Sequence, residues 1–464
     1  MFYPDLLSQF DQFLATTQPV YLVGGAIRDA LLGRPCVDFD FVTTEDPRSI
    51  GRKVADELGG NFFLLDKQRH TCRVLADQRG KPGRIYDFSA RQGDSIEMDL
   101  SQRDFTINAM AINLHDPDRI IDPFNGRGDL AHKLLKPVSP EALISDPLRT
   151  LRAIRYAANL DLRMDREALT QLQDAVYRLG QVSMERKRDE LFKILDGKRV
   201  TSALKLLEQF KIRENFPLAE FETNGANLDR VRSLEALIQW SCGEKKASAE
   251  QNFFEASFRS YFERHKDSLR EYFSQKNAAG RSRKAILLLA MWLQGSPWER
   301  DSGKGQFLSL STDEINFLEQ FTDYYLLPVE FFQQSLIPEP IQIYDYFQIS
   351  LDAGVDLLFA FLAEQYAKPA AENNQREWLA RLEFVSQYLS AWFNTPELID
   401  PKPLLDGNEI MANLQLAAGP EVGMYLEALK REQVKGKITT KKEAIAWLDL
   451  VPTIASTNPK RKLD

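Results

Sequence analysis

The stretch that decides the fold is LVGGAIRDALLGRPCVDFDFV, residues 22–42. It starts with the end of an apolar run typical of a strand, turns at Gly24-Gly25 and continues as AIRDALLG (26–33), which predicts a helix. Two glycines let the backbone approach a bulky anion, and a helix that opens directly afterwards supplies N–H donors. Arg28, one turn into this helix, can add further donors. Alone, such a turn is more often simple turn geometry than a phosphate site.

Two aspartates follow in VDFDFV (37–42), a run that predicts a strand. Alternate residues of a strand share a face, so Asp38 and Asp40 point together while Phe39 points into the core. Neighbouring carboxylates repel each other unless a cation lies between them, and a pair of divalent metal ions suits such a site. The alternative is a solvated strand edge with two exposed aspartates. The Gly-Gly turn and Arg28 just upstream favour the metal site.

The surrounding sequence predicts an α+β head followed by helices. Short β-type and helical runs alternate up to about residue 140, and helical periodicity then continues almost without interruption. A helix is predicted over 48–60, and Pro401 and Pro403 indicate a break before a last helical segment. The polar end STNPKRKLD (456–464) has the composition of a disordered tail. Besides 37–42, the predicted strands are PVYLV (19–23), NFFLL (61–65), TCRVLA (71–76) and RIYDFS (84–89).

A second candidate block is QRDFTINAMAINL, residues 102–114. Apolar and polar residues alternate from Phe105 onward, which predicts a strand beside a site. The side chains of Arg103, Asp104 and Asn108 could bind a ribose or a phosphate through their donors and acceptors. An ion pair and a strand-end cap explain the same residues without a ligand.

A third block is ISDPLRTLRAIRYAANL, residues 144–160, which predicts a helix with Asp146 as N-cap and Pro147 as its first residue. Leucine, isoleucine and alanine form a buried stripe along this helix. An aspartate and an arginine one turn apart, Asp146 and Arg149, could imitate the pairing edge of a base. Simple capping and a solvated face are the alternatives. The other arginines on or beside this face are Arg152 and Arg155.

Charge and composition limit the partners. The net charge is -8, so a protein that coats nucleic acid by overall charge is excluded, although a local basic face is not. No run of eighteen apolar residues occurs, so we expect no membrane span. The three cysteines lie far apart, which argues against a disulfide framework and fits a cytoplasmic protein. The candidates for RNA contacts are Arg186, Lys187, Arg188, Lys435 and Lys437, with solvated helix faces as the alternative.

Together these blocks resemble the class II tRNA nucleotidyltransferases and bacterial poly(A) polymerases of the DNA polymerase β superfamily. The first two blocks are similar to the family patterns GGxVRDxLLG…DxD and RRDFTINAMA, and the third to EDPxRxLRxxRFAAxL. Further matches to the family lie at 122–130 (DPxxGxxDL) and 183–191 (SxERxxxEL). The resemblance covers most of residues 19–195.

The resemblance implies a catalytic head (1–140), a helical neck with the nucleotide-selecting motif (141–200), a helical body (201–400) and a tRNA-binding tail (401–464). It implies Mg²⁺ bound by Asp38 and Asp40, with Asp87 as a third catalytic carboxylate. CTP or ATP would be the nucleotide, and the acceptor arm and 3′ end of tRNA the partner. By this resemblance Gly24, Gly25 and Arg28 hold the triphosphate, Arg103, Asp104 and Asn108 select the ribose, and Asp146 and Arg149 pair with the base, supported by Arg152 and Arg155.

Two departures from the family pattern bear on specificity. Ser145 stands where the family usually has Glu, and the segment between Asp87 and Arg103 is short. Relatives that build the whole CCA end usually carry a longer loop there, so we expect an enzyme that adds CC and leaves the A to a separate enzyme. A full CCA-adding enzyme, a poly(A) polymerase and an inactive RNA-binding protein are the alternatives. A poly(A) polymerase is expected to have a strongly basic tail, and only KRK (460–462) qualifies.

Overall fold

The computed structural model describes residue 10 and residues 18–66, 71–76, 83–216, 225–243, 253–295, 308–369 and 374–451. The chain divides into two compact units, Met1–Ala219 and Glu220–Asp464, and each is described by itself. The predicted head and neck fall in the first unit, and nearly all of the predicted body and tail in the second. The divisions near residues 140 and 400 lie inside these units and stay predictions. The expected disorder of 456–464 lies outside the described residues.

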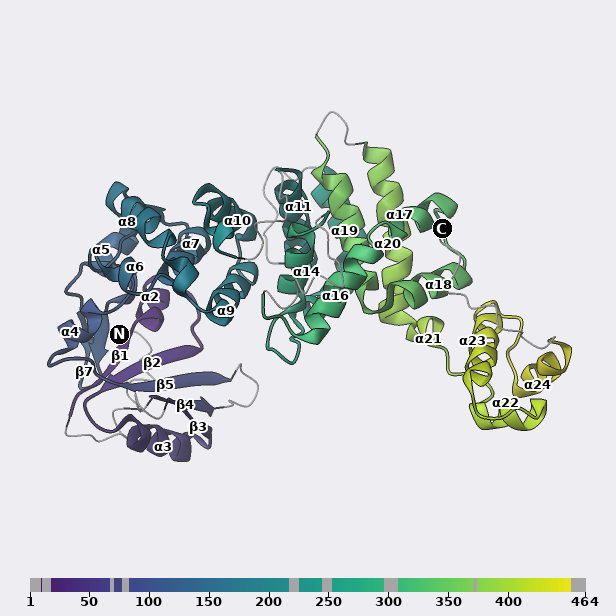
Figure 1. Ribbon diagram of the computed structural model, residues 1–464, viewed down its shortest axis with the longest axis horizontal. Coiled ribbons are helices and arrows are strands. Elements are labelled where there is room, and N and C mark those ends of the chain that lie inside the picture. The colour runs from purple at the N-terminus through teal and green to yellow at the C-terminus, as the bar shows by residue number, and fades with distance from the viewer. Residues whose placement is uncertain are drawn as a thin grey trace. The chain divides into compact units, whose positions relative to one another are not determined.

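A seven-stranded mixed sheet forms the first half of the first unit, in the order β3-β4-β5-β2-β1-β6-β7 (Figure 1). β2 and β5 run parallel, and the other neighbouring strands run antiparallel. The five strands predicted between residues 19 and 89 are confirmed, each to within one residue at either end, and so is the α+β head. The strands are β1 (Val20–Val23), β2 (Asp38–Thr43), β3 (Asn61–Asp66), β4 (Thr71–Ala76), β5 (Arg84–Ala90), β6 (Ala111–Asn113) and β7 (Asp116–Ile121).

The alternation along β2 separates a core face from a polar face. Phe39 and Phe41 are buried, whereas Asp38 and Asp40 are exposed. The two phenylalanines stack on aromatic rings of β5 and share one core with Ile50 of the helix α3 (Pro47–Leu58). In Figure 1, α3 lies on one side of the sheet and the later helices α7 and α9 on the other. The burial of the phenylalanines therefore directs both carboxylates away from the core.

The predicted strand over 102–114 is wrong for most of its length. Only Ala111–Asn113 forms a strand, β6, whereas Thr106–Asn108 forms the 3-10 turn η1. All side chains from Asp104 to Ala111 are buried, so the alternation of polar and apolar residues does not mark two faces. The polar residues can be buried because other parts of the chain supply hydrogen-bond partners.

Helices complete the first unit on the polar side of the sheet and beyond it. The predicted helices over 26–33 and 48–60 are confirmed as α2 and α3, and Gly59 ends α3 in the left-handed conformation. The buried stripe of α7 is also confirmed, but α7 begins at Arg149 and not at Pro147. These helices are α2 (Gly25–Leu31), α4 (Ile96–Ser101), α5 (Gly126–Ala131), α6 (Ala142–Ser145), α7 (Arg149–Leu160), α8 (Arg166–Val176), α9 (Met184–Leu195) and α10 (Val200–Gln209).

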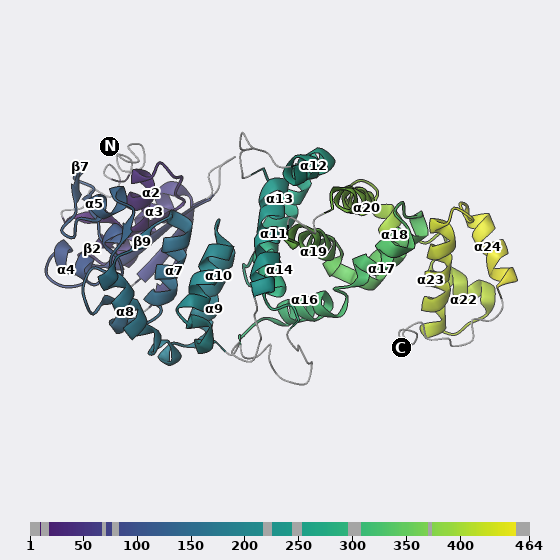
Figure 2. The ribbon, with the colours of Figure 1, turned by 90° about the horizontal axis from the view of Figure 1, so that it is seen from above.

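The second unit is helical over its described residues (Figure 2). Its core is rich in aromatic rings. The ring centroid of Phe359, for example, lies 6.3 Å from that of Phe258 and 4.9 Å from that of Phe273. The aromatic runs of this unit therefore pack helices together. The helices are α11 (Gly225–Ser241), α12 (Phe253–Phe262), α13 (Lys266–Ser274), α14 (Arg283–Trp292), α16 (Thr312–Asp323), α17 (Leu327–Gln334), α18 (Pro340–Ser350), α19 (Gly354–Ala367), α20 (Gln375–Asn394), α21 (Pro396–Ile399), α22 (Gly407–Leu414), α23 (Pro420–Val434) and α24 (Lys441–Leu450).

The last three helices have a hydrophobic cluster of their own, which includes Leu405, Tyr425 and Leu448. They contact α18 through polar groups, since the Tyr344 hydroxyl donates to Glu427 at 2.7 Å. A separate small core followed by a polar contact is compatible with the predicted tail from residue 401.

Among the described helices, one stretch is long and apolar enough to cross a membrane, residues 340–367. Its most apolar window is 78% buried inside the structure, and the 3-10 turn Leu351–Ala353 separates its two halves, α18 and α19. Burial of this kind is typical of a core helix in a helical domain.

Gly126 determines how closely α5 approaches η1. A Cβ atom at this position would lie 2.2 Å from the carbonyl oxygen of Thr106, whose hydroxyl donates to Asp129 of α5. We expect Gly126→Ala to push α5 off η1 and to lower the free energy of unfolding of the first unit by about 1–3 kcal/mol. Hydrogen exchange of the buried amides of α7 measures this change.

Gly180→Ala is the matched control, because a Cβ atom at Gly180 would meet nothing within 4 Å. Tryptophan fluorescence would miss the effect, since all six tryptophans lie beyond residue 219. Equal exchange rates in the two variants would contradict the close contact.

Candidate active site

A polar cleft of about 630 Å³ lies in the first unit between the sheet and the helices α7 and α9. It brings together all of the predicted catalytic and nucleotide-binding residues except Arg155, and one of the predicted RNA contacts, Arg186. The lining residues are Gly24, Gly25, Arg28, Asp38, Asp40, Arg73, Asp87, Gln102, Arg103, Asp104, Asn108, Asp146, Leu148, Arg149, Arg152, Tyr156, Arg186 and Lys193.

Three neighbouring strands place charged groups in one row across the floor of the cleft. Asp40 of β2 pairs in register with Asp87 of β5, which pairs with Arg73 of β4. Arg73 donates two hydrogen bonds of 2.8 Å to the Asp87 carboxylate. Asp87 is therefore an acceptor already held by an arginine, whereas Asp38 and Asp40 face the cleft from one strand.

The pKa of Asp40 is raised above its usual value. Desolvation within the cleft is the largest cause, and the charges of Asp87 and Asp38 add to it, while Arg103 opposes them. The ionised carboxylate therefore lacks compensating positive charge, which a divalent cation would supply. The described residues contain no group of three or more His, Cys, Asp or Glu side chains that could hold a metal ion. Asp38 and Asp40 offer the hard oxygen ligands that Mg²⁺ prefers, and a metal held by these two would keep coordination positions for water or phosphate.

The Gly24-Gly25 turn lies against two arginines. Gly24 has φ 76°, and a Cβ atom there would lie 2.9 Å from Nη1 of Arg103. Arg28 is 8% exposed, with Nη1 donating to Asn108 at 2.6 Å and Nε donating to Asp29 at 2.9 Å. Nε of Arg103 is buried and has no hydrogen-bond partner within the described part of the chain. The turn thus places fixed cationic donors where an anion could bind.

Asp104 is the centre of the polar network. It accepts hydrogen bonds from the backbone N–H of Phe105 at 2.8 Å, from Asn108 at 3.0 Å and from Nε of Arg152 at 2.8 Å. Burial opposes its ionisation, but Arg152 and the hydrogen bonds outweigh burial and hold the pKa of Asp104 below its usual value. Asp104 therefore links the 102–108 segment to α7 as an anion at neutral pH.

Asp146 follows α6 as its C-cap and is not the N-cap of α7 as predicted, whereas Arg149 is the first residue of α7. One oxygen of Asp146 accepts from the backbone N–H of Leu148 at 3.3 Å. Nη1 of Arg149 donates to the carbonyl oxygens of Arg103 and Ala142, and Nη2 donates to that of Gln102 at 2.6 Å. Both side chains are thus held in place at the wall of the cleft.

Arg155 does not line the cleft but contacts residues next to it. Its Nε donates to the buried Glu190 of α9 at 2.5 Å. Its guanidinium lies 4.4 Å from the ring centroid of Tyr156, and those of Arg28 and Arg152 lie 5.1 and 5.7 Å from the same ring. One tyrosine therefore supports three arginines by cation–π contacts.

The predicted RNA contacts have different environments. Arg186 lines the cleft, and Arg188 is partly exposed beside Asp189 at 2.9 Å. Lys187 is 4% exposed and its amine donates to the carbonyl oxygen of Asn215 at 2.8 Å, so the structure does not place it on a surface open to RNA. Lys435 and Lys437 are exposed and both pair with Glu432.

The sequence alone gave no role in the site to four residues that line the cleft: Arg73, Gln102, Leu148 and Tyr156. Arg73 could have been found, because in TCRVLA it alternates with the apolar residues of a predicted strand. Tyr156 could not, because its position beside three arginines depends on how α2 and α7 pack.

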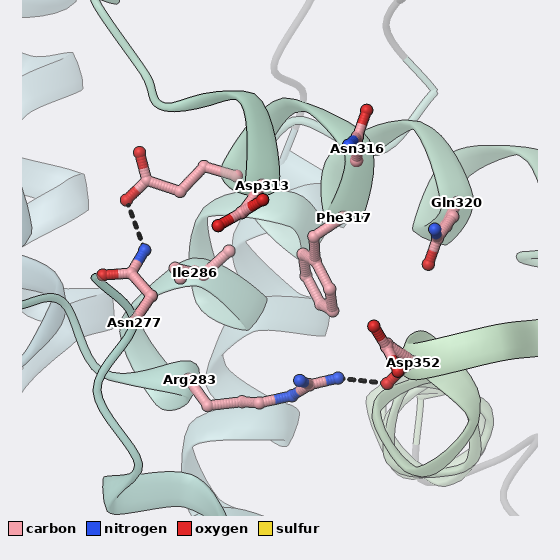
Figure 3. Close-up of a pocket in the computed structure, with 9 residues that line it drawn as sticks. Asn277, Arg283, Ile286, Asp313, Asn316, Phe317, Gln320 and Asp352 are labelled. Atoms are coloured by element: carbon pink, nitrogen blue, oxygen red, sulfur yellow. Dashed lines mark hydrogen bonds between the residues drawn. The ribbon is translucent and has the colours of Figure 1, made fainter. Parts of the chain in front are cut away.

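A second hollow, of about 230 Å³, lies in the second unit (Figure 3). Arg283 points across it and donates to the carbonyl oxygen of Asp352, and Asn277 donates to Glu314 at 2.9 Å. Glu314 is also paired with Arg281 at 2.6 Å. Arg283 and Glu314 are each held by ion pairs within the second unit, which indicates a structural role for these two side chains.

Comparison with known proteins agrees with this geometry. Residues 20–136 match the poly A polymerase head domain, and residues 161–221 match a probable RNA and SrmB-binding site of polymerase A. A CC-adding tRNA nucleotidyltransferase of Geobacter sulfurreducens is 31% identical over 92% of this chain and 91% of its own length. An A-adding tRNA nucleotidyltransferase of Deinococcus radiodurans is 27% identical over 92% of this chain and 94% of its own length. The Thermotoga maritima CCA-adding enzyme complexed with tRNA shares the fold, with a TM-score of 0.60 at 22% identity over 96% of this chain and 93% of its own.

The Asp104–Arg152 pair gives a test of the network. Asp104→Asn keeps the shape but removes the charge, which leaves Arg152 without its anion. We expect the free energy of unfolding of the first unit to fall by about 2 kcal/mol, as seen by hydrogen exchange of α7 amides.

The sign of the pH dependence follows from the lowered pKa of Asp104. Its stabilising effect is complete above the unfolded-state pKa of about 3.9 and is lost as the pH falls through the lower folded-state pKa. The difference between wild type and Asp104→Asn is therefore constant above about pH 5 and shrinks below about pH 4. A difference that shrinks at higher pH would contradict the ion pair.

Proposed function

The chain belongs to the family of tRNA nucleotidyltransferases and bacterial poly(A) polymerases, and we propose that it adds CC to the 3′ end of tRNA with CTP as substrate. The observation that carries the proposal is the cleft, where two carboxylates suited to Mg²⁺ face fixed arginines and the Asp146–Arg149 pair. A separate A-adding enzyme would then complete the CCA end. None of the three cysteines forms a disulfide, which is compatible with a reducing cytoplasm.

The reaction joins the 3′-hydroxyl oxygen of the tRNA to the α-phosphorus of CTP. The hydroxyl proton passes to solvent, and pyrophosphate leaves with the electrons of the broken P–O bond. Held by Asp38 and Asp40, Mg²⁺ would supply Lewis acidity for the hydroxyl and neutralise charge on the phosphates. Arg28 and Arg103, beside the Gly24-Gly25 turn, would bind the triphosphate in line with the hydroxyl. Their contribution is positioning and charge stabilisation.

Cytosine selection would depend on Asp146 and Arg149. A carboxylate accepts a hydrogen bond from the exocyclic amine of cytosine, and an arginine donates to its ring acceptors. Uracil presents an oxygen where cytosine has its amine, and that oxygen would face the carboxylate. Asp104 and Asn108 would contact the ribose. They are hydrogen-bonded to Arg152 and Arg28, respectively.

The short segment between Asp87 and Arg103 supports CC over CCA addition. In the structure it ends in α4 (Ile96–Ser101), where Asp99 pairs with Arg103 at 3.3 Å and accepts from the backbone N–H of Gln92 at 3.0 Å. A segment pinned in this way leaves little chain for a rearrangement of the site from CTP to ATP.

Primer extension tests the proposal. With a tRNA transcript that ends at its discriminator base, we expect CTP alone to give CC and added ATP to give no further product. Addition of A after CC would indicate a full CCA-adding enzyme. Extension by ATP only on a tRNA that already ends in CC would indicate an A-adding enzyme, and long adenylate tails would indicate a poly(A) polymerase. No extension with any nucleotide would overturn the proposal.

The catalytic carboxylates provide a second prediction. Asp38→Asn and Asp40→Asn should each lower kcat for CMP addition by about a thousandfold or more, because each removes a charge that metal binding requires. Asp118→Asn, an exposed aspartate on β7 outside the cleft, is the control and should retain wild-type rates. Full activity of either cleft variant would rule out the assigned metal site.

A further inference from the structure

Arg186 is the residue of the cleft whose position argues against the role expected from the sequence. It comes from α9, yet its Nη2 donates to Oδ2 of Asp146 at 2.9 Å, forty residues away in the chain. The other oxygen of Asp146 accepts from the backbone N–H of Leu148. Each oxygen of this carboxylate thus has one fixed donor.

We propose that Arg186 is a specificity-determining positioning residue, which orients the Asp146 carboxylate toward the base and thereby sets the preference for cytosine over uracil. The proposal rests on the proposed function and refines it. A carboxylate held at both oxygens cannot rotate away from the oxygen of uracil. Two acceptors, the carboxylate and the uracil oxygen, would then face each other without a hydrogen bond, which is costly.

The position of Arg186 is itself fixed by the packing of α9. One turn further along α9, Glu190 is 2% exposed and accepts a hydrogen bond of 2.5 Å from Nε of Arg155 in α7. Next to Arg186, the amine of Lys187 is bound by the carbonyl oxygen of Asn215. Two buried side chains that follow Arg186 therefore anchor α9 and fix the backbone position from which the guanidinium reaches Asp146.

Arg149 is fixed independently of Arg186. Its three hydrogen bonds go to carbonyl oxygens of residues 102, 103 and 142. Loss of Arg186 therefore frees Asp146 but leaves Arg149 in place. The two halves of the base-reading pair can be perturbed separately.

The main alternative is that Arg186 contacts a phosphate of the RNA. Its side chain is 54% exposed, so part of the guanidinium is open to a polyanion. The ion pair with Asp146 favours the positioning role, because an arginine already paired with a carboxylate has fewer donors for a phosphate. The two roles differ in which kinetic constant they change.

The experiment compares wild type, Arg186→Gln and Arg186→Lys in single-nucleotide addition with CTP and with UTP. For Arg186→Gln we expect the ratio of kcat/KM for CTP over UTP to fall by about tenfold or more, with the KM for tRNA unchanged. Arg186→Lys, which can still donate one bond to Asp146, should keep part of the preference. In an Asp146→Asn background, Arg186→Gln should have no further effect on the ratio.

Arg178→Gln is the control, because Arg178 is exposed and lies outside the cleft in the same unit. Because the side chain of Arg186 is more than half exposed, we expect its variants to fold, and hydrogen exchange of α7 checks this directly. An unchanged CTP preference overturns the proposal, and an unchanged preference with a raised KM for tRNA identifies Arg186 as an RNA contact.

A failure of the proposed function can be distinguished from a failure of the positioning role of Arg186. If wild type adds no nucleotide at all, calorimetric binding of CTP and UTP without RNA still tests Arg186. Loss of a CTP preference in Arg186→Gln then supports the positioning role, and equal preferences in the two proteins contradict it.

Discussion

The pair between Asp104 and Arg152 is the interaction on which the cleft depends. It joins the segment between β5 and β6 to the helix α7, and Nη2 of Arg152 lies 2.6 Å from Asp104. The same carboxylate orients Asn108, which in turn holds Arg28 beside the glycine turn. Candidate nucleotide-binding groups from three separate blocks of sequence are therefore linked through one buried anion.

The charges of the cleft are close to balance. Its lining residues include seven cationic and five anionic side chains. The arginines are held by carboxylates, carbonyl oxygens and the ring of Tyr156, so little entropy is lost when a polyanion binds. The floor is different, because Asp38 and Asp40 lie side by side with too little positive charge near Asp40. A metal–nucleotide complex would supply positive charge to the floor through its metal ion and negative charge to the arginines through its phosphates.

Local pattern was enough to predict the floor of the cleft, and long-range packing was needed for the rest. Strand alternation in VDFDFV determines which face carries the aspartates, so the prediction required no tertiary information. The same argument failed for residues 102–110, because the buried polar groups there find partners on other elements. Arg186 lies on α9 and Asp146 just before α7, and no local rule could pair them.

Lys187 shows a failure that a closer use of periodicity could have avoided. On a helix it shares a side with Leu191 and Ile194, which are buried. A basic residue within an apolar stripe belongs to the interior, whatever the charge of its neighbours in sequence. Glu190, by contrast, is buried because Arg155 of another helix pairs with it.

The most direct test is a crystal structure of the protein with Mg²⁺ and a CTP analogue whose α-phosphorus cannot be attacked. The proposed function predicts the metal at Asp38 and Asp40, the triphosphate against Arg28 and Arg103, and the amine of cytosine at Asp146. A nucleotide bound in the hollow of the second unit, or in the cleft with its base turned away from Asp146 and Arg149, would contradict it.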